Sequence, residues 1–169
     1  MKFVITVGVI VFAFVILVGS YAKTLPISIE DQNMDIVKLS FYAFRDGDWA
    51  SFADLHSADY LQHSPGYDDP ITWSEYELSA RIVHARLPDL RIRIVDIFAV
   101  EDRVAVRSIW EYRNKSYRFR RHYPDGIAQG SEISIFRIKD SMIIEEWCEH
   151  DPKPVKSFCT VYKSLERMK

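Results

Sequence analysis

The chain has 169 residues, of which 48% are apolar and 14% aromatic, and its formal net charge is −2 at pH 7. This length and composition favour one well-packed globular domain and exclude a disordered chain. The near-neutral charge argues against nucleic acid as a partner, because binding phosphates usually needs a strongly basic surface. The one basic stretch, residues 113–122, is more typical of a solvated hairpin than of a nucleic-acid or membrane contact.

Residues 1–22 have the pattern of a targeting segment rather than of a folded element. An apolar run over residues 3–18 is followed by the small residues Ser20 and Ala22, as in a signal peptide cleaved before Lys23. The alternative is an uncleaved membrane anchor, although the run is shorter than the roughly 20 residues of a comfortable span. We therefore expect the domain to be exported, periplasmic or extracellular, or to be anchored in the membrane.

Residues 23–30 are predicted to be a linker, and residues 31–169 to form the domain. Three helices are expected in its first half, over about residues 31–45, 49–56 and 72–86. Apolar side chains recur at helical spacing in the first, and Thr72 and Glu75 form a capping-box pattern at the start of the third. The stretch 60–66 is expected to be irregular, because a proline and a glycine interrupt its periodicity.

The periodicity changes from helical to alternating at about residue 90. Strands are predicted over about residues 90–100, 104–112, 130–138 and 142–150, with a final amphipathic helix over residues 154–168. In the first strand the alternation slips at Ile94 and Val95, which indicates a bulge. Lys139 and Asp140 are expected to form the hairpin turn before the last strand. Helices followed by an antiparallel meander predict an α+β domain.

The end of the last predicted strand carries the most informative group of titratable side chains. If the chain stays extended, Glu145, Trp147, Glu149 and Asp151 share one face. An apolar neighbour such as Trp147 can desolvate a carboxylate and raise its pKa, which would make Asp151 a general base. The structural alternative is that Asp151 begins a turn, because Pro152 follows it.

The same region offers two further kinds of chemistry, a disulfide and a metal site. Cys148 and Cys159 could form a disulfide in an oxidising compartment or remain buried thiols, and their spacing does not decide between the two. We expect no metal, because the histidines and acids near residue 150 lack the short helical spacing of strong metal-binding motifs.

Four short motifs, in this order along the chain, resemble the SnoaL-like polyketide cyclases of the nuclear-transport-factor-2-like superfamily. They are Tyr60–Pro65, Leu87–Leu90, Asp102–Arg107, and Met142–Trp147 followed by Asp151. The resemblance covers about residues 31–158. It implies a cone-shaped, curved antiparallel sheet wrapped by three N-terminal helices, with a pocket at the open end and, by analogy, a homodimer.

The resemblance also implies an activity, an intramolecular aldol ring closure that needs neither metal nor cofactor. The catalytic carboxylate of the family falls on Asp151, and its histidine after the second helix falls on His63. A further histidine of active members is replaced here by Arg113 or Asn114. The residues expected to contact a ligand are Tyr60, Trp147, Arg107, Tyr42 and Trp73, although Arg107 is explained equally well by a salt bridge to Glu111 or a neighbouring strand.

Two functions follow as hypotheses. The first is an exported, cofactor-free cyclase, isomerase or lyase of a small hydrophobic carbonyl compound, with Asp151 as base and His63 as proton donor. The second is a non-catalytic domain that holds a small hydrophobic ligand or a partner in the same pocket. The replaced histidine and the export signal favour the second hypothesis, whereas Asp151 and His63 favour the first.

Overall fold

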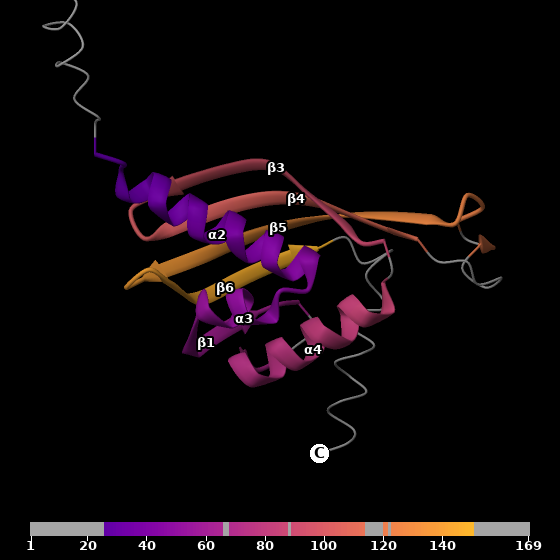
Figure 1. Cartoon of the computed structure of the whole chain (residues 1–169), viewed down its shortest axis with the longest axis horizontal. Coiled ribbons are helices and arrows are strands. Elements are labelled where there is room, and N and C mark those ends of the chain that lie inside the picture. The colour runs from indigo at the N-terminus through magenta and orange to yellow at the C-terminus, as the bar shows by residue number, and fades with distance from the viewer. Residues whose placement is uncertain (1–25, 66–67, 88, 114–119, 122, 151–169) are drawn as a thin grey trace, which may run out of the picture.

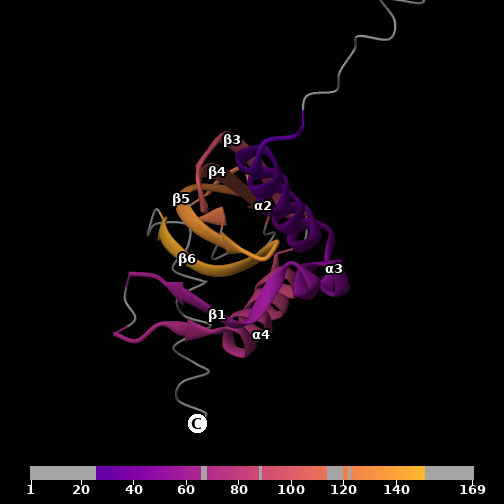
Figure 2. The same cartoon turned by 90° about the vertical axis from the view of Figure 1, so that its left-hand side faces the viewer.

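The computed structural model describes residues 26–65, 68–87, 89–113, 120–121 and 123–150. Its elements are α2 (Ile29–Asp46), α3 (Trp49–Asp54), β1 (His56–His63), β2 (Ile71–Thr72), α4 (Trp73–Arg86), β3 (Arg91–Val100), β4 (Arg103–Arg113), β5 (Ile127–Lys139) and β6 (Met142–His150). Three helices gather on one side of a curved, open sheet (Figures 1 and 2). The predicted α+β class is therefore confirmed.

The sheet has six strands in the order β2-β1-β6-β5-β4-β3. Strands β3 to β6 form the predicted antiparallel meander, whereas β1 pairs with β6 in parallel. The prediction of an irregular stretch over residues 60–66 was wrong for its first part, because β1 continues to His63. Its residues Leu61 to His63 pair with Glu145 to Trp147, and this long-range pairing could not be read from local periodicity.

The helix boundaries follow from capping side chains. Helix α2 begins after Ser28 rather than at Asp31, because the Ser28 hydroxyl accepts a hydrogen bond from the backbone N–H of Asp31 at 3.0 Å. It ends at Gly47, whose φ of 70° suits a residue without a side chain. The short α3 ends at Asp54, before the predicted His56. The capping box at the start of α4 is confirmed.

Two irregularities set which side chains face inward. The pairing of β3 with β4 shifts between Ile94 and Asp96, which confirms the predicted bulge. The pairing of β5 with β6 shifts between Arg137 and Ile138, opposite Ile143 and Glu145. The intervening residue Ile144 is therefore extra, and from Glu145 onward the even-numbered residues of β6 point to the inner face.

The main core lies between the inner face of the sheet and α2. Val37 and Phe41 of the helix pack against a patch of strand residues, and Phe41 meets Phe136 edge-on with ring centroids 5.9 Å apart. The strand residues are Val104, Val106, Phe136, Ile138 and Ile143. On the opposite, outer face several apolar side chains stay exposed, among them Phe98 at 63% and Ile133 at 54%.

Within the described ranges, no helix is long and apolar enough to cross a membrane. The apolar run 3–18 and the expected helix 154–168 lie outside these ranges, so export, anchoring and the terminal helix stay predictions.

Candidate functional site

The inner face of the sheet carries a polar cluster where β5 and β6 run side by side. Glu132 lies directly opposite His150, and Ser134 opposite Cys148, in the antiparallel register. Glu146 precedes Cys148 by two residues, so both lie on the same face of β6, and Glu146 is only 3% exposed. Alternation along two strands thus brings two carboxyl groups, a hydroxyl and a thiol together in the interior.

Three neutral groups donate hydrogen bonds to Glu146. The hydroxyl of Tyr60 on β1 donates to Oε2 at 2.6 Å, and the side-chain amide of Gln62 donates to the same oxygen at 3.1 Å. The hydroxyl of Ser134 on β5 donates to Oε1 at 2.9 Å. Burial raises the pKa of Glu146, but all three hydrogen bonds counter this by favouring its ionised form.

Glu132 is the partner carboxyl of this pair. Protein surrounds it closely, yet part of its surface still reaches solvent, unlike that of Glu146. Burial, and then repulsion from Glu146, raise the pKa of Glu132 to about 8. At neutral pH the pair therefore holds one proton. Two adjacent buried carboxylates cannot both be charged without a large energetic cost.

Cys148 completes the cluster as a buried, free thiol. Burial and the two nearby carboxyl groups raise its pKa, so the thiol stays protonated and is a poor nucleophile. Donor atoms of Glu132, Glu146 and Cys148 lie within 4.8 Å of one another, a spacing that could also suit a cation. Because Glu146 is already bound by neutral donors, we interpret the cluster as an acid–base group rather than as a metal site.

Aromatic side chains enclose the far side of the cluster. Tyr60, 1% exposed, meets the His56 ring edge-on, and His56 stacks on Trp73 with centroids 4.6 Å apart. The Nδ1–H of His56 donates to the carbonyl oxygen of Phe52 at 2.7 Å, and burial lowers its pKa to about 4. His56 is therefore neutral, and this wall is apolar and fixed.

His63 and Trp147 lie elsewhere, on the outer face at the end of β1. Their rings stack with centroids 5.2 Å apart and an interplanar angle of 6°. The His63 Nε2 lies 2.9 Å from a carboxylate oxygen of Glu145, and the other oxygen of Glu145 pairs with Arg137 at 2.9 Å. These contacts place His63 on the opposite side of the sheet from the Glu132–Glu146 pair.

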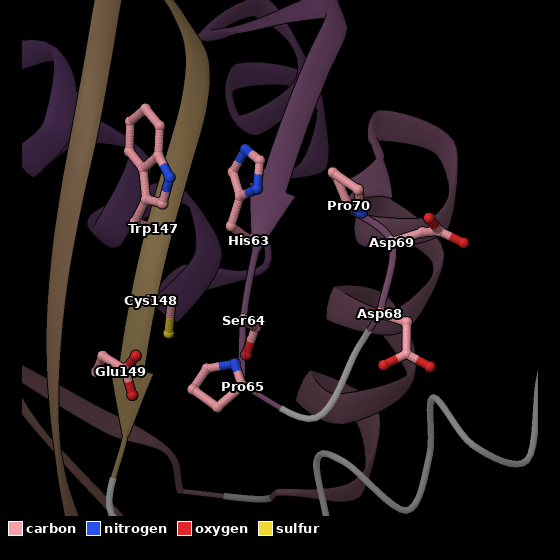
Figure 3. A pocket seen from close by; sticks show the side chains of 9 residues that line it. All are labelled: His63, Ser64, Pro65, Asp68, Asp69, Pro70, Trp147, Cys148 and Glu149. Atoms are coloured by element: carbon pink, nitrogen blue, oxygen red, sulfur yellow. The ribbon is translucent and has the colours of Figure 1, made fainter.

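A pocket of about 280 Å³ opens beside this stack (Figure 3). Three successive residues of β6 form one wall, and the segment between β1 and β2 forms the other. The lining residues are His63, Ser64, Pro65, Asp68, Asp69, Pro70, Trp147, Cys148 and Glu149. Cys148 is shared by the lining of the pocket and the interior cluster.

The other predicted site residues are dispersed. Arg107 is exposed and pairs with Asp96 of the neighbouring strand β3 at 2.6 Å, as the salt-bridge alternative expected. Tyr42 is 43% exposed on α2, with the guanidinium of Arg45 4.9 Å from its ring centroid. Trp73 is packed in the core, and Tyr60 is the one predicted ligand contact that reaches the interior pair. Asp151 lies outside the described residues.

Glu132, Glu146, Gln62 and Ser134 were missed in the sequence. The odd- and even-numbered residues of β6 face opposite sides of the sheet. The site was predicted on the odd-numbered side because Trp147 lies there. A signal for the other face was present, because Glu132 and Ser134 alternate with Ile133 and Ile135 along β5. In an isolated strand that pattern indicates a solvated polar face, and only the position of the helices shows that it points inward.

The chain is similar to a known domain family and to several solved structures. The family model of the SnoaL-like domain matches residues 37–146. IdmH of Streptomyces antibioticus, a proposed polyketide cyclase, superposes with a TM-score of 0.63 at 20% identity over 76% of this chain and 99% of that one. A proposed polyketide cyclase of Bacillus cereus gives 0.61 at 16% identity over 75% and 79%.

A third solved structure with the same fold carries a different assignment. AclR of Streptomyces galilaeus, a proposed hydroxylase, gives a TM-score of 0.62 at 18% identity over 76% of this chain and 96% of that one. Identities this low establish the fold and leave the chemistry open. Among curated proteins, none matches the sequence.

Proposed function

Because the chain belongs to the family of SnoaL-like domains, we propose that it is a cofactor-free acid–base enzyme, a cyclase or isomerase of a small hydrophobic carbonyl compound. The fold alone does not define the reaction, so the proposal depends on the residues of the site. The likeness to IdmH and to the Bacillus cereus protein favours a polyketide-like substrate within this class.

One observation carries the proposal: Glu132 reaches solvent beside the buried Glu146, and its pKa is raised to about 8. A group that titrates near neutral pH can both give and take a proton under working conditions, which is what acid–base catalysis requires. In an isomerisation or aldol closure, a proton leaves the carbon next to a carbonyl while the carbonyl oxygen gains negative charge. In this proposal Glu132 exchanges that proton, and the apolar wall around Tyr60 limits competition by water.

The Asp151–His63 pair stays a prediction beside this one. The contacts of His63 with Glu145 and Trp147 support a structural role for it.

Exchange of the α-proton tests the proposal without knowledge of the natural substrate. The protein is incubated in D2O with a panel of small aryl ketones and β-keto esters, and deuterium incorporation is followed by NMR. We expect Glu132→Gln to slow incorporation by about 100-fold or more, the usual contribution of a general acid or base. Glu101→Gln, a matched change in the exposed turn between β3 and β4, outside both the interior pair and the pocket, should leave the rate unchanged.

The pocket of about 280 Å³ favours one alternative, a binding domain that performs no reaction. In that case a panel compound binds to the wild type and to Glu132→Gln with equal affinity, and neither protein exchanges the α-proton. Exchange that is equally fast in both proteins would instead assign the chemistry to another group, Asp151 being the first to test.

A further inference from the structure

Ser134 lies between the two carboxyl groups of the interior pair. Its hydroxyl oxygen is 2.9 Å from Oε1 of Glu146 and 3.2 Å from Oε1 of Glu132. A serine hydroxyl has one hydrogen, so it can donate to only one of these oxygens at a time. If both groups were ionised, the other contact would bring two oxygens together with no hydrogen between them. The geometry is satisfied when one carboxyl group is protonated and donates to Ser134.

The surroundings of the pair decide which carboxyl group holds the charge at rest. Glu146 accepts hydrogen bonds from Tyr60 and Gln62, and these two donors are fixed on the neighbouring strand β1. In the described part of the chain, Glu132 instead has the neutral thiol of Cys148, a weaker hydrogen-bond donor, beside it, and His150 lies across the strand pair. The resting charge therefore belongs on Glu146 and the proton on Glu132.

We propose that Ser134 relays a proton between Glu146 and Glu132, and that Tyr60 and Gln62 are positioning residues that hold the charge on Glu146. In the relay, the Glu132 carboxyl gives its proton to the Ser134 oxygen while the Ser134 hydroxyl gives its own to Glu146. Glu132 becomes ionised, Glu146 becomes neutral, and Ser134 is unchanged, so atoms and charge balance.

The relay rests on the proposed function and deepens it, because it lets one site act in both directions. Glu132 touches the substrate, and Glu146 stores the proton behind it. After passing its proton inward, Glu132 can remove a proton from a carbon atom and deliver it to the product. The ionised Glu132 then regains the stored proton from Glu146 through Ser134.

Titration of the carboxyl groups tests the relay in the absence of substrate. Protein labelled with ¹³C at the glutamate carboxyl carbon is titrated and followed by NMR. In the wild type, the titration step of Glu132, which is the pH at which its carboxyl signal is half shifted, is expected near pH 8. Ser134→Ala removes two hydrogen bonds from the singly protonated pair and only one from the doubly ionised pair. The step should therefore move down by about one pH unit, the equivalent of one hydrogen bond.

Ser134→Thr keeps the hydroxyl and should restore the step, because only the relaying oxygen matters. Ser79→Ala is the matched control, since Ser79 is also a buried serine but donates to the carbonyl oxygen of Tyr76 on α4. It should leave the titration unchanged. An unchanged step in a folded Ser134→Ala protein, or a step that Ser134→Thr lowers as much, would overturn the relay.

A double-mutant cycle covers the case in which Ser134→Thr does not fold. Glu146→Gln ends the relay at a neutral amide, so adding Ser134→Ala to it should lower the step by much less than in the wild type. Fully additive shifts would contradict the relay.

The titration is independent of turnover. If the titration confirms the relay but the protein does not exchange the α-proton, the enzymatic function is rejected and the proton-sharing pair is not. If the protein exchanges the α-proton but Ser134→Ala leaves the titration step in place, only the relay is rejected.

Discussion

At the scale of single residues, two buried groups impose opposite pH dependences on stability. The pKa of Glu132 is raised by burial from 4.5 to about 8, so its contribution is complete below the lower value and is lost as the pH rises toward 8. The pKa of His56 is lowered by burial from 6.5 to about 4, so its contribution is present above 6.5 and is lost as the pH falls toward 4. Between pH 4.5 and pH 6.5 the two effects offset each other, so the molecule should be most stable in this range.

Thermal unfolding can show whether Glu132 causes the loss of stability at alkaline pH. Between about pH 6.5 and pH 8.5 the Tm of the wild type should fall by several degrees, because the folded state releases a proton that the unfolded state has already lost. Glu132→Gln cannot ionise, so its Tm should stay nearly constant over the same range, while Glu149→Gln should follow the wild type. An equal decline in all three proteins would show that Glu132 is not the responsible group.

At the scale of elements, the turn between α2 and α3 depends on one glycine. Gly47 has a φ of 70°, and a Cβ added there would lie 3.0 Å from Cε1 of His84. That ring is held in place, because the Nε2 of His84 lies 3.1 Å from the carbonyl oxygen of Arg45. The residue therefore meets two constraints, a left-handed backbone and a close aromatic neighbour.

Gly47→Ala should accordingly lower the free energy of unfolding by about 1–2 kcal/mol from the backbone alone, and by more if His84 cannot move. Urea unfolding measures the loss. In a His84→Ala background the contact is absent, so the same substitution should cost only the backbone part. A larger or equal cost in that background would mean that the His84 ring does not contribute.

The elements also show how far the sequence determined the outcome. The meander, the bulge beside Val95 and the capping box at Thr72 are local patterns, and they were predicted correctly. Strand β1 was missed because His56–His63 has no alternation of its own and becomes a strand through its pairing with β6. The interior site was missed for the same reason, since Glu146 and its donors Tyr60 and Gln62 meet only across that pairing.

At the scale of the whole molecule, the outer face of the sheet is the part that the described helices α2, α3 and α4 leave uncovered. One row across it runs through the paired residues Phe98, Ala105, Ile135 and Trp147. Phe98 is 63% exposed and Ile135 is 39% exposed. An apolar row of this kind on a sheet face is typical of an association surface, and it supports the proposal that the protein forms a homodimer.

Sedimentation velocity tests the homodimer directly. Phe98→Glu places a charge in the apolar row and should convert a dimer into a monomer. Leu39→Glu is the matched control, because Leu39 is 54% exposed but lies on α2, away from the row. A wild-type monomer at micromolar concentration would refute the dimer, and a dimer that resists Phe98→Glu but not Leu39→Glu would move the interface to the helical side.

The parallel pairing of β1 with β6 also has a consequence for the nascent chain during its synthesis. Tyr60 and Glu146 are 86 residues apart, so β1 leaves the ribosome long before the strand that completes the middle of the sheet. Until β3, β4 and β5 have followed, the helices have no sheet to cover, and β1 lacks its partner β6 until the end, so their apolar side chains are open to aggregation. Contacts so distant in sequence also slow folding, because a long loop has to close before they form. The nascent protein should therefore depend on chaperones until its last strand has been synthesised.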